Sequence, residues 1–320
     1  MQTPLWETEE RLRVFTDAPV NYIHQSDGFL DFDRPCNVVV QRETTELHLA
    51  EAESRLAIRC AFRGERHFEA GGGRFVVDDT GYLILNPGMT VSSSLQSPTP
   101  VECFNITFRP GFAEDVLHSL VTPADRLLET PYAPGDQPVE FFVKRYPHDE
   151  TLSPVLSRMR STLKTEQVSY GWVEDQCHEL VERMLTVHRS TCREIEAIPS
   201  VRHATRVEVY LRLTRARDFM EASLSEPITL VDLAAVACCS PHHFLRLFKQ
   251  HFGETPHQYL MRLRLQRACT LLKHTEMPVT EICFRVGFES LGSFSWLFRR
   301  RLGLSPSEYR ASDLPLPERP

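Results

Sequence analysis

The chain has 320 residues, a length that favours two domains, each large enough to bury its own core. Hydrophobic residues make up 42% and charged residues 25%, close to the globular average, which excludes a disordered, collagen-like or coiled-coil chain. The formal net charge is −7 but is unevenly distributed. Residues 201–310 hold 16 Lys and Arg against 10 Asp and Glu, a net charge of +6, whereas the rest carries −13. An anionic partner is therefore expected at the C-terminal part.

The sequence predicts neither a membrane span nor a secretory signal. The longest uncharged stretch, residues 80–101, contains four Ser, three Pro and two Gly and so lacks a long apolar run. Glu7, Glu9 and Glu10 follow the N-terminus where a signal peptide would be basic and then apolar. Nine cysteines without a CxxC pair fit neither a disulfide framework nor a zinc ribbon. We expect a cytoplasmic protein with reduced cysteines.

Short apolar segments between residues 21 and 108 predict an all-β domain. They are rich in Val, Ile, Leu, Phe and Thr and are separated by Gly, Asp and Pro, as is typical of strands joined by turns. Examples are Glu46–Leu49, Leu56–Phe62, Gly73–Val77, Tyr82–Leu85 and Cys103–Phe108. After Pro110 the period changes, and apolar residues recur at helical spacing within 151–164 and 171–187. Two helices are expected to follow the strands.

A stretch rich in Pro, Glu and Arg at residues 191–203 is expected to be a linker. Beyond it, start and stop signals predict seven helices. Three helices begin at Ser or Thr followed by Pro, and three end at Gly: Ser240-Pro241, Thr255-Pro256, Ser305-Pro306, Gly253, Gly287 and Gly303. The predicted helices are 205–222, 230–237, 242–251, 256–274, 278–286, 290–301 and a final turn after 305.

Two segments in this region repeat one pattern, a short helix, a tight turn and a second helix whose inner face is Phe-x-x-x-Phe. The phenylalanines are Phe244 and Phe248 in the first segment and Phe294 and Phe298 in the second, and all four are expected to be helix core. The pattern predicts two helix-turn-helix units. Helix 256–274 could hold their second helices about one DNA turn, roughly 34 Å, apart.

These residues resemble the DNA-binding domain of the AraC/XylS family of bacterial transcription regulators. The resemblance rests on segments 210–218, 228–237, 240–249, 264–272, 286–290 and 303–310. It implies an α+β protein of two domains, in which a cupin-like β-barrel with trailing helices precedes an all-α seven-helix domain with two helix-turn-helix units. The implied limits are 1–190 for the sensor and dimerisation domain, 191–203 for the linker, 204–310 for the DNA-binding domain and 311–320 for a tail.

The resemblance places base contacts on the outward face of each second helix. They are His242, Leu245 and Arg246 in the first, and Leu291, Gly292, Ser295 and Trp296 in the second. Arg246 is the strongest candidate because its guanidinium can reach O6 and N7 of guanine, a contact that discriminates by about 1–3 kcal/mol. A local salt bridge or a phosphate contact is the alternative. The family usually carries Arg where this chain has Trp296, so thymine methyls, sugars or phosphates are the expected partners there.

Phosphate contacts are expected from basic side chains and helix starts around these positions. Unpaired N–H groups and the dipole attract anions to a helix start, and Arg and Lys neutralise phosphates. The candidates are Lys249, Thr255, Arg264, Arg299, Arg300 and Ser305. For each surface Arg, a solvated charge is the competing interpretation.

The segment Gly81–Gly88 resembles the Gly-x-Leu-x-Leu-x-Pro-x segment of cupin-like sensor barrels. Cupin enzymes bind a metal through His-x-His, a downstream Glu and a later His. Here His67 and Glu69 have no second His nearby, and residues 89–94 lack the later one. We therefore expect no metal, no cofactor and no catalytic residue, and a barrel that holds a small-molecule effector or nothing. Its lining depends on strand register, so no effector contact is assigned.

The helical stretch 151–187 has two interpretations. The resemblance implies a homodimer formed through these helices, whereas the alternative is that they cover the barrel's own open face. Both hold if different faces are used.

Three other classes of protein fit less well. A cupin-type oxygenase or isomerase would need the missing ligands, and an architectural DNA-bending protein rarely carries a large acidic domain. A methyl-accepting DNA-repair regulator needs four N-terminal cysteines, whereas only Cys36 and Cys60 precede residue 100. The sequence predicts an effector-responsive transcription regulator, an activator as most relatives are, which is no enzyme. Its expected partners are double-stranded promoter DNA, RNA polymerase and a small-molecule effector, and no membrane.

Overall fold

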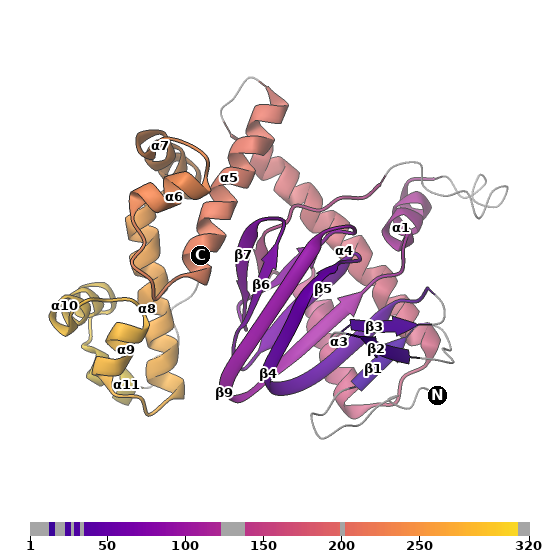
Figure 1. Cartoon of the computed structure of the whole chain (residues 1–320), viewed down its shortest axis with the longest axis horizontal. Helices are drawn as coiled ribbons and strands as arrows, with labels where there is room; N and C mark the ends of the chain where they lie inside the picture. The colour runs from indigo at the N-terminus through magenta and orange to yellow at the C-terminus, as the bar shows by residue number, and fades with distance from the viewer. Residues whose placement is uncertain are drawn as a thin grey trace. The chain divides into compact units, whose positions relative to one another are not determined.

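The computed structural model describes residues 13–16, 23–26, 29–32, 35–122, 138–198 and 202–312. The chain divides into two compact units, residues 1–207 and 208–320, and the division falls within helix α5 (His203–Ala222) (Figure 1). The first unit is built on an antiparallel sheet, and the second is helical. Among the helices described, none combines the length and apolar character that crossing a membrane requires.

An antiparallel sheet with the strand order β1-β4-β9-β5-β8-β10 organises the first unit. Its strands are β1 (Arg13–Thr16), β4 (Val38–Glu53), β5 (Ala57–Phe62), β6 (Arg66–Ala70), β7 (Gly73–Val77), β8 (Gly81–Leu85), β9 (Thr90–Thr107) and β10 (Arg145–Pro147). Strand β6 pairs with β7 and with the first half of β9. A separate two-stranded sheet joins β2 (Ile23–Ser26) and β3 (Phe29–Phe32).

Strands β4 and β9 are longer than the short strands that the sequence predicts. The second half of β9 pairs with β4 and β5, whereas its first half pairs with β4 and β6. The register shifts after Thr44 and again after Leu49, and irregularities of this kind bend a strand. Pro98 and Pro100 lie in β9 between the paired residues 96 and 101. These interruptions break the alternation, so each long strand looks like two short ones in the sequence.

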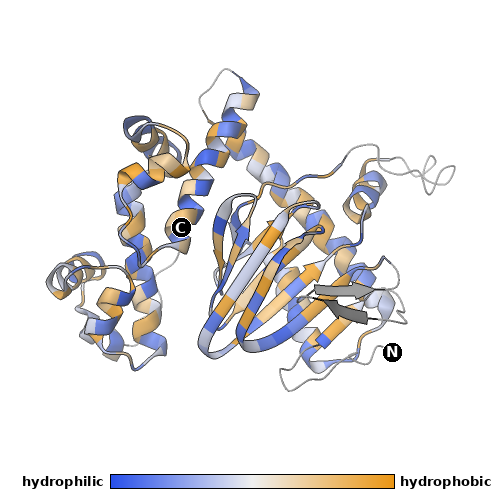
Figure 2. Cartoon of the chain, in the orientation of Figure 1, coloured by the Kyte–Doolittle hydropathy of each residue, from blue (hydrophilic) through white to orange (hydrophobic). Residues whose placement is uncertain are grey.

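Three helices pack against one face of the sheet: α1 (Phe112–Val121), α3 (Ser153–Thr165) and α4 (Tyr170–Glu196). Alternate residues of β9, such as Phe104 and Ile106, are completely buried against α3 and α4 residues such as Met159 and Leu180. Figure 2 shows the corresponding alternation of hydrophobic and hydrophilic residues along the strands. The inward faces of α3 and α4 therefore cover the sheet of their own chain, as one of the two interpretations of 151–187 expects.

The predicted linker at 191–203 begins inside a helix, because α4 continues to Glu196. The buried side chains of Thr191 and Ile195 are four residues apart and extend the apolar stripe of α4 by one more turn. The stretch of Glu and Arg that suggested a linker lies on the outward side of this turn. Helix α5 then starts at His203, so the connection between α4 and α5 is shorter than predicted.

The seven predicted C-terminal helices are confirmed. They are α5, α6 (Leu230–Val236), α7 (Pro241–Phe252), α8 (Pro256–His274), α9 (Val279–Arg285), α10 (Leu291–Leu302) and α11 (Pro306–Ala311). Residues 313–320, which make up most of the predicted tail, lie outside the described residues. All nine cysteines lie in the described ranges as free thiols, and six of them are buried. Within those ranges, no three His, Cys, Asp or Glu side chains are grouped so that they could hold a metal ion.

Candidate nucleic-acid interface

The helical unit contains two helix-turn-helix units built on the same plan. Helices α6 and α7 form the first and α9 and α10 the second, and α8 connects them. Phe244 and Phe248 are completely buried in one apolar core, and Phe294 and Phe298 are completely buried in another. The expectation that the four phenylalanines are helix core is therefore confirmed. Their burial turns the opposite faces of α7 and α10 toward solvent.

The turn between the two helices of each unit needs a left-handed residue. In the first turn this residue is Cys238, with φ of 50°, and Arg212 donates a hydrogen bond to its carbonyl oxygen at 3.0 Å. In the second turn it is Gly287, with φ of 90°. A Cβ atom on Gly287 would lie 2.4 Å from the carbonyl oxygen of Leu224 and 2.8 Å from the Arg264 guanidinium. Only glycine fits there, both for its backbone angle and for space.

Arg264 is not available to a DNA phosphate, contrary to the sequence-based prediction. Its side chain is buried, and it donates hydrogen bonds from Nε to Leu224 O at 2.9 Å and from Nη2 to Glu226 O at 2.8 Å. Burial lowers the pKa of Arg264, an effect that the charge of Glu289 opposes. The guanidinium ties the loop after α5 to α8 beside Gly287. Its position in the middle of a long amphipathic helix gave no signal of this role.

The solvent-facing side of α7 carries the first set of predicted base contacts. His242 and Arg246 are exposed and Leu245 is half-buried, and all lie away from the buried Phe244. The Nη2 atom of Arg246 lies 3.2 Å from Nδ1 of His243, one turn earlier on the helix. This contact holds the guanidinium over the start of α7. His243 is a neighbour that the sequence alone did not single out.

The solvent-facing side of α10 carries the second set. Leu291 and Trp296 are 38% and 61% exposed, large values for apolar side chains, Gly292 is exposed and Ser295 is half-buried. The Arg300 guanidinium lies over the Trp296 indole, 4.9 Å from its centre. Such a cation–π contact orients both side chains on one surface. Trp296 stands 50 positions after Arg246, so an aromatic platform replaces a guanidinium at the equivalent place.

Basic side chains flank the solvent-facing sides of α7 and α10 that carry the predicted base contacts, called the reading faces below. Lys249 on α7 is exposed, and its equivalent on α10, Arg299, is exposed as well. With Arg300 and Arg301 they place four cations in the last turns of the two helices, where the helix dipole also favours positive charge. Arg301 continues the Arg299-Arg300 run, a signal in the sequence that the prediction of phosphate contacts did not use.

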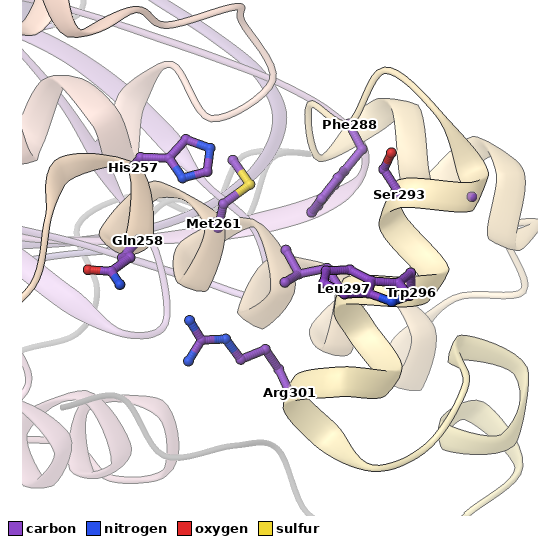
Figure 3. Close-up of a pocket in the computed structure, with 9 residues that line it drawn as sticks. His257, Gln258, Met261, Phe288, Ser293, Trp296, Leu297 and Arg301 are labelled. Carbon is purple, nitrogen blue, oxygen red and sulfur yellow. The ribbon is translucent and has the colours of Figure 1, made fainter.

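A pocket of about 630 Å³ lies beside the reading face of α10. Its apolar lining comes from Met261 of α8, from Phe288, and from Trp296 and Leu297 of α10. Figure 3 shows Arg301 extending from α10 toward the side of α8 that carries Gln258. Trp296 and Gly292 belong both to this pocket and to the predicted base contacts. The pocket is therefore part of the same surface.

The two helix starts predicted to contact phosphates differ in charge. At α8, the side chains of Thr255 and Gln258 cap each other's backbone, and this capping box is neutral. At α11, Glu308 takes the place of Gln258, and its carboxylate accepts a hydrogen bond of 2.7 Å from Ser305 N. This bond and one from the Ser305 side chain lower the pKa of Glu308, so the group is anionic at neutral pH. An anionic side chain therefore already lies at the start of α11, where the sequence predicts a phosphate contact at Ser305.

Two exposed, cation-flanked helices on repeated helix-turn-helix scaffolds define a DNA-binding protein. Residues 233–312 match the helix-turn-helix domain family. The probable transcriptional regulator LumQ of Photobacterium leiognathi is 36% identical over 100 residues, and the transcriptional activator RhaS of Enterobacter sp. (strain 638) is 41% identical over 99 residues. Each alignment covers 31% of this chain, and 40% of LumQ or 36% of RhaS, so the chain spans well under half of either relative.

A solved structure shows the same similarity. It is a transcriptional regulator of the AraC-type DNA-binding domain-containing proteins from Chromobacterium violaceum, 38% identical, with a TM-score of 0.30. The match covers 31% of this chain and 89% of that one. Through its C-terminal domain, the chain belongs to the AraC/XylS family of DNA-binding transcription regulators.

Proposed function

We propose that the protein is a sequence-specific regulator that binds promoter DNA by placing α7 and α10 in successive major grooves. The observation that carries the proposal is the pair of solvent-facing helices on equivalent scaffolds, each backed by two completely buried phenylalanines. Arg246 reads a guanine in the first half-site, with His242 and Leu245 beside it. Trp296, Leu291, Gly292 and Ser295 contact thymine methyls and sugars in the second.

Phosphate contacts come from the cations that flank these faces. Lys249 and Arg299 occupy equivalent positions, Arg300 adds a further charge, and the neutral helix start at Thr255 contributes the positive end of the helix dipole. Such contacts fix the position of the protein on DNA without reading its sequence. They account for the net charge of +6 in residues 201–310 against −13 elsewhere.

The N-terminal part is proposed to be a cupin-like sensor and dimerisation domain. The proposed limits are 1–190 for the sensor and 204–310 for the DNA-binding domain. An effector bound in the sensor acts if it favours the arrangement of domains that binds DNA. Homodimers form through outward faces of α3 and α4, since their inward faces cover the sheet. The protein has no catalytic role and acts in the cytoplasm.

We propose activation as the direction of control. One of the relatives, RhaS of Enterobacter sp. (strain 638), is named a transcriptional activator, which supports this direction. An activator must also contact RNA polymerase, which is the further proposed partner. Transcription in vitro from a promoter that carries the selected site tests this point, because activation raises and repression lowers the yield of transcript when the chain is added.

The DNA proposal is tested by selection from a randomised DNA pool with the full chain over a series of salt concentrations. Two half-sites about one helical turn apart are expected, and Arg246→Ala relaxes one position of the first half-site only. Arg74→Ala, which removes the same charge from β7 in the first unit, is the matched control and leaves the motif unchanged. A steep salt dependence without an enriched motif contradicts the proposal, because it indicates binding to phosphates alone.

A further inference from the structure

On the face of the sheet turned away from α3 and α4, polar side chains adjoin the apolar core that Leu83, Val101 and Cys103 help to form. β9 lies between β4 and β5, and its outward residues Phe104 and Ile106 are fully buried under the helices. Asn105 and Thr107 point the opposite way and stay partly exposed, as does Arg59 opposite Asn105 on β5. Solvent therefore reaches this part of the face.

Two arginines are hydrogen-bonded to these polar side chains. Arg66, at the start of β6, is only 2% exposed and donates to Ser93 Oγ at 2.7 Å and to Asn105 Oδ1 at 3.4 Å. Its guanidinium also lies 4.6 Å from the centre of the Phe68 ring. Arg59 donates to Thr107 Oγ1 at 3.0 Å. The Nε atom of Arg66 is buried without a hydrogen-bond partner.

The acceptors on these two arginines are all neutral. Burial and the neighbouring charge of Arg66 lower the pKa of Arg59 to about 9, and burial likewise lowers the pKa of Arg66. The outer face of the same strand is different, because there the buried Glu102 accepts hydrogen bonds of 2.7 and 2.6 Å from Arg160 and Lys164. Buried charges are ordinarily paired, and like charges that are desolvated together destabilise a fold.

We propose that Arg59 and Arg66, with Asn105 and Thr107, bind the anionic group of a small organic effector, a carboxylate or a phosphate. Two guanidinium groups offer several N–H donors to the oxygen atoms of one anion, a geometry that favours carboxylate and phosphate over chloride. The free Nε–H of Arg66 gains an acceptor, and the repulsion between the two cations is offset. Val40 of β4, which pairs with Asn105 and is partly exposed on the same face, suits the organic part.

The inference rests on the proposed function only in naming the ligand an effector. The binding site itself is tested without DNA, by thermal unfolding of the full chain in sodium benzoate, in sodium phosphate and in benzamide. Benzamide has the shape of benzoate without its charge. Ligands that bind the folded state raise the unfolding midpoint as their concentration rises. Benzoate or phosphate is expected to raise it and benzamide is not, and the stronger of the two salts tells carboxylate from phosphate recognition.

The variant Arg59→Met is expected to change thermal unfolding in two ways. Without ligand, removal of one of two repelling cations raises the unfolding midpoint of the N-terminal unit by roughly 2–4 °C. With anion, the same variant loses the concentration-dependent shift. Arg74→Met is the matched control, because Arg74 is 59% exposed on β7 and pairs with Glu69 at 3.3 Å. It keeps the anion effect and has no stabilising effect of its own.

Three outcomes overturn the proposal. They are a shift in benzamide equal to that in benzoate with none in phosphate, an anion effect that persists in Arg59→Met, and a free Arg59→Met chain less stable than the parent. The half-buried position of Arg59 makes this variant safer than one at Arg66, and Arg59→Gln checks the result with a polar side chain. Adding the same anion to the DNA-selection assay separates the two hypotheses. A thermal shift without any selected motif supports the anion site and contradicts the DNA proposal.

Discussion

The two helix-turn-helix units have nearly the same scaffold but different surfaces. Phe244, Phe248 and Gly253 recur 50 positions later as Phe294, Phe298 and Gly303. The reading positions differ, because His242 and Arg246 in the first unit are replaced by Gly292 and Trp296 in the second. Buried positions must fill a defined volume, whereas exposed positions are constrained only by what they bind. Under the proposed function, the first helix-turn-helix unit would read polar base edges and the second would read shape and apolar groups.

The largest expected effect concerns the turns. Gly287→Ala places a Cβ atom against Leu224 O at a strained backbone angle. We expect a loss of about 3 kcal/mol in the stability of the second helix-turn-helix unit. Cys238→Gly at the equivalent turn changes stability by less than about 1 kcal/mol, because relief of strain offsets the entropy of glycine. Hydrogen exchange over a urea series, followed in α6 and α7 peptides for Cys238→Gly and in α9 and α10 peptides for Gly287→Ala, measures the two effects. If both variants change stability by less than about 1 kcal/mol, the second turn does not require glycine more strictly than the first.

Arg264→Met tests the connection between helix α8 and the loop after α5. Two carbonyl oxygens, those of Leu224 and Glu226, lose their donor, so a loss of about 1–2 kcal/mol is expected. Arg285→Met, at an exposed site on α9, is the control and changes stability by less than about 0.5 kcal/mol. Below the unfolding temperature, the salt dependence of DNA binding by Arg264→Met matches that of the parent. A reduced dependence contradicts the structural role and restores the phosphate contact.

Trp296→Arg makes the second reading helix resemble the first. The new guanidinium takes the position that Arg246 has in the first helix-turn-helix unit. The variant is therefore expected to bind sites with guanine at the matching position roughly tenfold more tightly. Selection from the randomised pool, followed by titration of the parent and variant motifs, measures the change. An unchanged motif shows that this position does not face bases. Trp296→Phe, which keeps an aromatic ring, is the control and retains the parent motif.

Lys249→Gln and Arg299→Gln test whether the equivalent cations act alike. Each is expected to weaken binding to all sequences by several-fold and to reduce the slope of log K against log salt by about 1. Fluorescence anisotropy at four salt concentrations gives the slope. A change in the slope for one variant alone means that only one of the two helices approaches the backbone at this position.

The smallest expected effect is the pH dependence of the two capping boxes. Hydrogen bonds from Ser305 lower the folded pKa of Glu308, so the stability they give is present above its unfolded pKa and is lost as pH falls through the folded pKa. The destabilisation by Ser305→Ala therefore shrinks in acid. At α8 the partner is the neutral Gln258, and Thr255→Ala costs about 1 kcal/mol at any pH. Hydrogen exchange of α8 and α11 at pH 7 and in acid measures both variants, and parallel behaviour contradicts the assignment.

The helical unit could be predicted almost completely from the sequence. Its caps and glycines act within one turn of the chain, so Thr255-Pro256 and Gly303 mark helix ends without any tertiary information. The N-terminal unit, which contains the antiparallel sheet, was predicted less well, because strand pairing is non-local. The bulges after Thr44 and Leu49 in β4 depend on partners in β9 that lie about fifty residues away.

The sequence by itself determined the two helix-turn-helix units, the buried phenylalanines and the outward faces that carry Arg246 and Trp296, because helical periodicity fixes which residues share a face. Only the tertiary structure decided that Arg264 is buried against the carbonyl oxygens of Leu224 and Glu226, and that Arg59 and Arg66 meet on one face of a sheet. Each of these depends on contacts between residues distant in the chain. Charge alone gives no sign of whether an arginine faces DNA, a carbonyl oxygen or another arginine.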